Sequence, residues 1–248
     1  MAHPATRSLA LLLVGFLAAG CDETLQYNVS VNAFAASSAS AYHTYIVLPR
    51  DAAVDSSDLE FEEYSRYVVA VLRRRGLRRV SDDNPDAQLA VFLGYGVGPP
   101  EEHSYTYLQQ LYGQTGVASA NTTSDVHLYG NSVTAKSKTT YEPRYGVTGY
   151  AERTGHYTTF TRHITLNAID VSQYKRKRLV EVWKTTIVSS GSSGDLRALF
   201  PVMLVGASNL IGVNTGQVIE RTVDEDSREL AWLRNRIGAL PRTAAPEE

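Results

Sequence analysis

Apolar and polar residues alternate along the start of the chain in the pattern of a strand with one buried face. This two-residue period runs over residues 27–33. A second strand is predicted over residues 44–48, a β-branched and aromatic run that Pro49 closes. Residues 87–95 are apolar at nearly every position, so we expect a central strand there that is buried on both faces.

The apolar spacing changes to that of a helix over residues 57–75. Apolar residues recur there every three or four positions and form one stripe. Ser57 and Glu60 have the spacing of a capping box, which predicts that the helix begins at Ser57. Gly76 follows the last apolar position and predicts its end.

The C-terminal part continues with strands and helices in turn. Strands are predicted over residues 157–170, 179–188 and 217–223, and amphipathic helices over residues 196–211 and 227–237. Pro201 is expected to lie off the apolar face of the first of these helices and to kink or restart it.

Residues 97–155 differ from the rest of the chain because they are rich in Tyr, Ser, Thr and Gly and poor in aliphatic residues. We expect a long, partly disordered excursion, with an extended hairpin arm as the other form it could take. Tyrosine offers a large contact area at low entropic cost, so the alternative is a contact surface for a protein or a glycan. The candidate contact residues are Tyr105, Tyr107, Tyr112, Tyr141, Tyr145, Tyr150 and Tyr157.

These elements predict one α+β domain over residues 27–238. We expect a mixed or mainly antiparallel sheet packed by two or three helices, with the excursion as an insertion and residues 239–248 as a disordered tail.

The first 21 residues have the layout of an export signal. Arg7 precedes an apolar run over residues 9–17, and small residues lead into Cys21. The end of this segment resembles the lipobox of bacterial lipoprotein precursors, in which the cysteine is acylated and becomes the first mature residue. Cys21 is also the only cysteine of the chain, which favours lipid attachment over a disulfide or a metal site. A plain secretory signal is the alternative, and the apolar run is too short for a membrane span.

This interpretation predicts that the protein lies in the bacterial cell envelope and faces the periplasm. Residues 1–20 are the expected signal peptide and residues 21–26 a short tether, so the domain is expected to sit against the membrane. The resemblance to enterobacterial lipoproteins implies that Asp22 favours the inner membrane, whereas other bacteria sort by different rules. The covalent lipid on Cys21 is the only cofactor expected.

Charge and motifs narrow the classes of function. The net charge of −2 gives no indication of nucleic-acid binding. No zinc-binding or nucleophile motif is present, and we predict neither catalytic nor metal-ligating residues. Ser172 and Lys175 have the Ser-x-x-Lys spacing, but we expect them in a hairpin link and not on a helix. The arginine run over residues 73–79 suits a helix C-terminus, with a patch for phosphate or lipid headgroups as the alternative.

Several segments together resemble a known family. They are AYHTYIVLP, YVVAVLRRRGLRRVSDDNPDAQLAVFLGYGVG, RYGVTGYAERTGHYTTFTRHITLNAID and RLVEVWKTTIVSSGSSGDLRALFPVMLVGASNLIG. In this order and spacing they are similar to the bacterial envelope lipoproteins grouped as domain of unknown function 4136. The resemblance covers most of residues 30–212 and implies an exported, lipid-anchored domain, with no site residues to carry over.

We therefore expect a non-catalytic envelope lipoprotein that binds or scaffolds another envelope protein. One alternative is a hydrolase or transferase that acts on cell-wall glycan or lipid, with a site assembled from residues distant in sequence. The other is a purely structural lipoprotein.

Overall fold

One mixed β-sheet organises residues 25–239, the part of the chain that the computed structural model describes. The strands are β1 (Gln26–Ala35), β2 (Thr44–Pro49), β3 (Arg78–Arg79), β4 (Leu89–Val97), β5 (Glu101–Tyr129), β6 (Ser132–Asp170), β7 (Glu181–Gly191) and β8 (Ile219–Asp224). The helices are α1 (Leu59–Arg74), α2 (Val171–Lys175), α3 (Leu196–Ala207) and α4 (Arg228–Ala239), with a 3-10 helix at Ala39–Ala41. The predicted signal peptide, Cys21 and most of the predicted tail lie outside the described residues.

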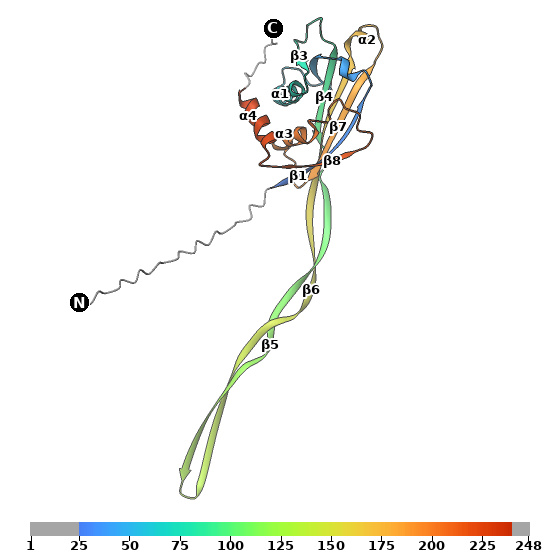
Figure 1. Ribbon diagram of the computed structural model, residues 1–248. Helices are drawn as coiled ribbons and strands as arrows, with labels where there is room; N and C mark the ends of the chain where they lie inside the picture. The colour runs from blue at the N-terminus through green and yellow to red at the C-terminus, as the bar shows by residue number, and fades with distance from the viewer. Residues whose placement is uncertain (1–24, 240–248) are drawn as a thin grey trace, which may run out of the picture.

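The sheet has the strand order β3-β2-β4-β6-β7-β1-β8, and β5 pairs with β6 alone (Figure 1). β2 runs parallel to β3 and β4, and the other neighbouring pairs are antiparallel. The predicted α+β class with a mixed sheet is confirmed. The two-residue strand β3 has no signal in the sequence because its ends are fixed by pairing with β2 alone.

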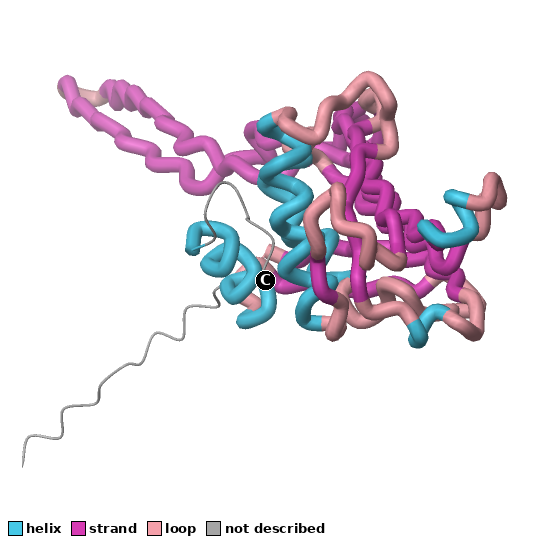
Figure 2. Tube along the Cα trace, turned by 90° about the horizontal axis from the view of Figure 1, so that it is seen from above, coloured by secondary structure: helices cyan, strands magenta, loops and turns pink. Residues whose placement is uncertain are grey.

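Helices α1, α3 and α4 cover one face of the sheet. Figure 2 shows this arrangement from above. Tyr64 of α1 stacks on Phe200 of α3 with 4.1 Å between ring centroids, and Tyr95 of β4 meets Tyr64 edge-on at 4.6 Å. The core is therefore built where two helices meet the middle of the sheet.

Helix α1 begins at Leu59, two residues after the predicted start. Its N-cap is Asp58, whose carboxylate accepts hydrogen bonds from the backbone N–H groups of Glu60 and Phe61. The predicted capping box is wrong, because the Ser57 hydroxyl donates to Asp55 in the preceding turn. Gly76 has a φ of 85° just past the helix end, as the predicted stop requires.

Helix α3 runs without interruption through Pro201. The expectation that Pro201 would lie off the apolar face is wrong, because its side chain is buried with those of Phe200 and Val202. Most of α3 is buried all round, so its apolar positions do not form the single stripe on which that expectation rested.

Strand β4 lies between β2 and β6, next to the middle of the sheet. Leu89, Val91 and Leu93 are fully buried under the helices, whereas Ala90 and Phe92 on the opposite face are only partly buried. The expectation of burial on both faces was therefore wrong, because the three packed helices cover only one side of the sheet.

Strand β6 continues from the globule into an arm. Only its inner part, residues 157–170, is predicted from the sequence, and the strand begins 25 residues earlier, at Ser132. Ile164, Leu166 and Ala168 are fully buried on the helix side of the sheet. Arg162 is buried on the same face, and its guanidinium donates to the backbone oxygens of Ser189 and Ser193. This contact holds the segment after β7 at the point where the arm begins.

The arm is a two-stranded hairpin that leaves the globule and twists along its length (Figure 1). Its paired residues run from Glu101 opposite Thr159 to Tyr129 opposite Ser132. The 29 residues of β5 span roughly 90 Å. Gly130, with a φ of 57°, opens the two-residue turn at the tip. The predicted excursion is therefore a hairpin arm over residues 101–159 and not a loop.

Candidate binding surface

The register of the arm divides its side chains between two faces. Residues directly opposite each other in an antiparallel pair point to the same side, and neighbours along a strand point to opposite sides. Contacts across the strands agree with this division. The Ser119 hydroxyl donates to the Glu142 carboxylate at 2.6 Å, and the Thr122 and Thr139 hydroxyls are 2.9 Å apart.

Charge separates the two faces over the outer part of the arm. Between residues 110 and 150, every charged side chain lies on one face, which we call the charged face. These residues are Asp125, Lys136, Lys138, Glu142 and Arg144. Asp125 lies directly opposite Lys136.

The other face, which we call the uncharged face, carries only apolar and neutral polar side chains over the same span. Nine of its residues come from β5: Gln110, Tyr112, Gln114, Val117, Ala120, Thr122, Ser124, Val126 and Leu128. Nine come from β6: Val133, Ala135, Ser137, Thr139, Tyr141, Pro143, Tyr145, Val147 and Tyr150.

The uncharged face continues the helix-packed face of the sheet. Phe160, Arg162 and Ile164 share this side of β6, and the same alternation runs outward from them. In the globule the helices cover this face, whereas along the arm its tyrosines and aliphatic residues are exposed. The arm is thus an extension of the core strand without its helical cover.

The seven predicted tyrosines do not form one surface. Tyr112, Tyr141, Tyr145 and Tyr150 lie on the uncharged face, with 62–73% of each side chain exposed. Tyr105, Tyr107 and Tyr157 lie on the opposite face near the base. A sequence count of tyrosines cannot separate these groups, because the separation depends on the register.

The basal tyrosines form a cluster with His103. The His103 ring stacks on Tyr157 at 4.9 Å, and Tyr105 lies 5.9 Å from Tyr107 and 6.1 Å from Tyr157. Gly155 lies under the Tyr105 ring, and a Cβ atom there would come within 2.6 Å of it. These contacts stabilise the base of the hairpin, where no third strand within residues 25–239 pairs with the arm.

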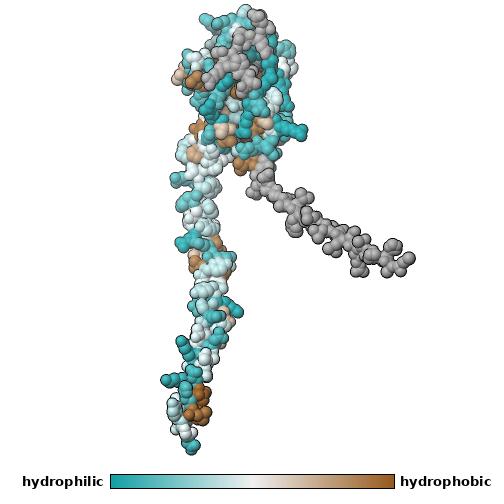
Figure 3. Space-filling view, turned by 90° about the vertical axis from the view of Figure 1, so that its left-hand side faces the viewer, coloured by the Kyte–Doolittle hydropathy of each residue, from teal (hydrophilic) through white to brown (hydrophobic). Residues whose placement is uncertain are grey.

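An apolar patch lies near the tip of the arm and was not predicted from the sequence. Val126, Leu128 and Val133 are 56%, 73% and 65% exposed, and Ala135 completes the patch opposite Val126. Figure 3 shows apolar residues gathered close to the tip. The alternation of these residues with His127 and Thr134 was the available signal, but it spans only two or three positions on each strand.

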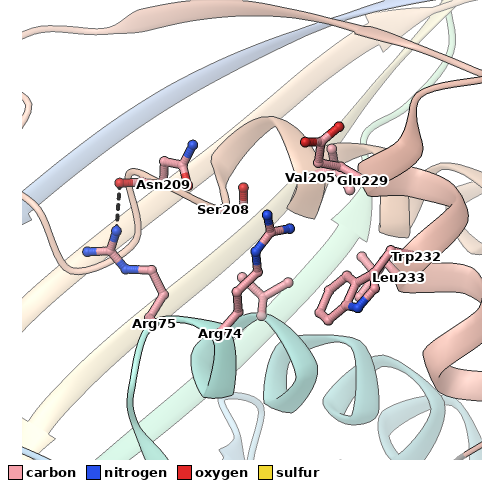
Figure 4. Close-up of a pocket in the computed structure, with 9 residues that line it drawn as sticks. Arg74, Arg75, Val205, Ser208, Asn209, Glu229, Trp232 and Leu233 are labelled. Carbon is pink, nitrogen blue, oxygen red and sulfur yellow. Dashed lines mark hydrogen bonds between the residues drawn. The ribbon is translucent and has the colours of Figure 1, made fainter.

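A pocket between the helices contains two residues of the predicted arginine run. It has a volume of about 310 Å³ and lies between the C-terminal part of α1, the end of α3 and α4 (Figure 4). Arg74 lies over the Trp232 ring at 5.3 Å, and Arg75 donates to the Asn209 backbone oxygen at 2.9 Å. Both side chains thus hold helices together, which weakens the reading of this run as a phosphate or headgroup patch.

A second pocket, of about 510 Å³, lies beside β4 and includes Arg50, Tyr95, His163 and Thr165. Burial raises the pKa of Tyr95 to about 12, with Glu60 and Asp58 adding to the effect. Arg50 donates to the Thr165 hydroxyl at 3.0 Å. The raised pKa disfavours the phenolate form of Tyr95 that a nucleophile or base would need, and the arginine is engaged in a structural contact.

The Ser172–Lys175 pair lies in the single-turn helix α2, within the link that joins the antiparallel strands β6 and β7. The predicted hairpin link is present, but the expectation that the pair would not lie on a helix is wrong. The Ser172 hydroxyl donates to the Asp170 carboxylate at 2.7 Å. Asp170 also caps α2 by accepting from the Gln173 N–H and receives the Tyr42 hydroxyl at 2.8 Å. The serine therefore belongs to the cap of this short helix.

Within residues 25–239, no group of three or more His, Cys, Asp or Glu side chains could hold a metal ion. In the same part of the chain, no helix has the length and apolar character needed to cross a bilayer. The predicted lipid attachment at Cys21 falls outside these residues.

Comparison with known proteins gives no family. No family model and no curated protein matches the chain. A PDZ domain protein from Parabacteroides distasonis is 12% identical with a TM-score of 0.35, and the lysenin pore is 8% identical with a TM-score of 0.11. Each comparison covers 81% of this chain, which spans 40% and 49% of the length of the two structures. Scores this low indicate neither a shared fold nor a shared function.

Proposed function

We propose that the protein is a lipid-anchored lipoprotein of the bacterial envelope that binds or scaffolds another envelope component through its arm. The observation that carries this proposal is the uncharged face, an exposed surface of eighteen residues on a strand pair held outside the globule. An isolated two-stranded hairpin is marginally stable in water, so a partner that covers one face is physically favoured. The sequence resemblance to bacterial envelope lipoproteins supports the lipid anchor and the envelope location in this proposal.

The position of the arm fits an anchor at Cys21. β1 begins at Gln26, at the end of the sheet from which the arm leaves (Figure 1). Five residue steps from Cys21 reach less than roughly 20 Å. A lipid on Cys21 would hold this end of the globule beside the membrane, so the partner of the arm is expected at or near the membrane surface.

The size of the uncharged face suits a protein partner. A standard protein interface uses about 20–30 residues on each side, and the uncharged face offers nine residues from each of two strands. Aromatic residues such as tyrosine are enriched in interface centres, while charged residues are depleted there. The charged face of the arm would then remain in water.

Affinity capture from the organism's own envelope tests this function. The full chain is compared with a variant in which residues 103–157 are replaced by Asn-Gly, which joins the opposed residues Glu102 and Thr158. We expect the captured partner to be lost with the arm. Replacing Tyr112, Tyr141, Tyr145 and Tyr150 by serine should have the same effect, whereas replacing Tyr105, Tyr107 and Tyr157 should preserve capture.

The anchor is tested in the same preparation. Cys21→Ser should remove labelling by radioactive fatty acid and move the protein out of the membrane fraction. Capture that is unchanged without the arm, or a native chain that takes up no label, would contradict the proposal.

A further inference from the structure

Strand β5 has an open edge with neither a charge nor a proline over most of its length. Among the described residues, β5 pairs only with β6. Residues 105–124 contain no Asp, Glu, Lys, Arg or Pro. Two bulges interrupt the strand at Thr115 and Ala118, but long exposed edges are usually also protected by charges, proline or a covering segment. This edge is therefore suited to accept another strand.

Strand β6 offers a second open edge of the same length. β7 pairs with β6 only from Phe160 inward, so residues 132–159 have no neighbour on that side among residues 25–239. This open segment is almost as long as the 29 residues of β5. A second copy of the chain thus supplies a strand that fits the edge of β5 without any further component.

Charge favours pairing of β5 with β6 over pairing of like strands. Asp125 is the only charged residue of β5 beyond Glu102, while Lys136 and Lys138 lie at the matching height on β6. A neighbouring β6 would bring its lysines beside Asp125, and opposite charges on directly opposed residues stabilise strand pairing. Two β6 strands paired with each other would bring lysines together.

We propose that copies of this chain assemble through their arms, with β5 of one copy pairing antiparallel to β6 of the next. This inference deepens the proposed function, because it names a second copy as a partner of the same arm. Antiparallel pairing of these two strands sets neighbouring arms side by side and pointing the same way. Chains anchored to one membrane surface can adopt that arrangement.

The register of such pairing is fixed by the two faces. Opposed residues share a face, so a matched register aligns the uncharged faces of all copies on one side. A slip by one residue would place Lys136 and Lys138 among the neighbour's tyrosines and aliphatic residues. The assembly therefore presents one continuous uncharged surface and one charged surface.

A lipid surface alone is a poorer occupant of the open edges. Hydrocarbon offers no hydrogen-bond partner to the N–H and C=O groups along the outer sides of β5 and β6, whereas another strand pairs with them. Thr122, Ser124, Ser137 and Thr139 also form a polar band across the uncharged face, between the tip patch and Tyr141.

Cysteine cross-linking between two differently tagged full-length chains in the native envelope tests the pairing. One chain carries Thr122→Cys in β5, and the other carries a single cysteine in β6, at Ser137, Thr139 or Tyr141. Cys21 is the only native cysteine, so the unsubstituted chains reveal any cross-link that it forms. A chain with Thr222→Cys on the exposed edge strand β8 is the control for chance collisions.

We expect disulfide-linked pairs of the two tagged chains for at least one β6 position. No such pairs should form when the partner chain carries Thr222→Cys in place of the β6 cysteine. The detergent-solubilised lipidated chain should sediment with a mass that is a multiple of the mature protomer, and the arm-deleted chain as a monomer. Cross-links only between two β5 or two β6 cysteines would overturn the proposal. A full chain that is monomeric and forms no cross-links would also overturn it, whether or not that monomer binds lipid vesicles. Arm-dependent capture of a different protein by such a monomer would preserve the proposed function while this inference fails.

Discussion

Asp170 shows how one side chain connects three parts of the fold. Its carboxylate accepts from Tyr42, from Ser172 and from the backbone of Gln173, and it lies at the end of β6. Burial alone would raise the pKa of Asp170, but these hydrogen bonds outweigh burial and the pKa lies below its usual value. The ionised form is thus favoured in the folded state.

This lowered pKa predicts a pH-dependent contribution to stability. The unfolded chain binds a proton to Asp170 at higher pH than the folded chain, so the stabilisation is complete above about pH 5 and declines as the pH falls below about 4. Asp170→Asn should therefore lower the free energy of unfolding by about 1–3 kcal/mol at pH 7, and by less at pH 3. Denaturant unfolding of both proteins at the two pH values measures the difference between their free energies of unfolding. A difference that does not change with pH would contradict a lowered pKa of Asp170.

Arg162 illustrates a residue whose role has no signal in the sequence. It occupies an inward position of β6, where the pattern of Ile164 and Leu166 would predict an apolar side chain. Burial lowers its pKa from the usual arginine value, and its guanidinium donates to the backbone oxygen of Ser189 in β7 and to that of Ser193 in the segment after β7. Only the packing of that segment against β6 explains a buried guanidinium at the base of the arm.

At the scale of elements, α1 shows which residue defines a helix start. Asp58→Ala should lower the free energy of unfolding by about 1 kcal/mol, because its carboxylate satisfies two N–H groups at the helix N-terminus. Ser57→Ala is the matched control and should change it by less than about 0.5 kcal/mol. Thermal or denaturant unfolding measures the loss of stability in both variants. Equal losses would contradict Asp58 as the N-cap and favour the capping box predicted from Ser57 and Glu60.

The elements with an apolar face against the core were predicted well. β1, β2, β7, β8, α1 and α4 lie within a few residues of their predicted ranges because each has an apolar side that meets the core. The arm was not predicted as a defined hairpin because neither of its faces is packed, so its alternation is of charge and not of hydrophobicity. Three register shifts also break that alternation between Leu111 and Ser119.

At the scale of the whole molecule, the arm and the globule are stabilised by separate contacts. Among residues 25–239, β5 pairs only with the arm part of β6, residues 132–159, and most side chains of the arm are exposed. We expect the variant with Asn-Gly in place of residues 103–157 to unfold with a free energy within about 1 kcal/mol of the full chain. Chemical denaturation followed by tryptophan fluorescence measures this, since Trp183 and Trp232 both lie in the globule. A loss of several kcal/mol would show that the arm supports the core.

Local chemistry in the sequence determined the α+β class, the approximate position of most elements and the unusual composition of the arm segment. These features depend on periodicity, turn residues and side-chain type, which neighbours along the chain can specify. Only the tertiary structure decided the strand order, the open edges of the arm and the division of its tyrosines between two faces. They depend on which residues stand opposite each other across strands, and that register is set by pairing between segments up to almost two hundred residues apart.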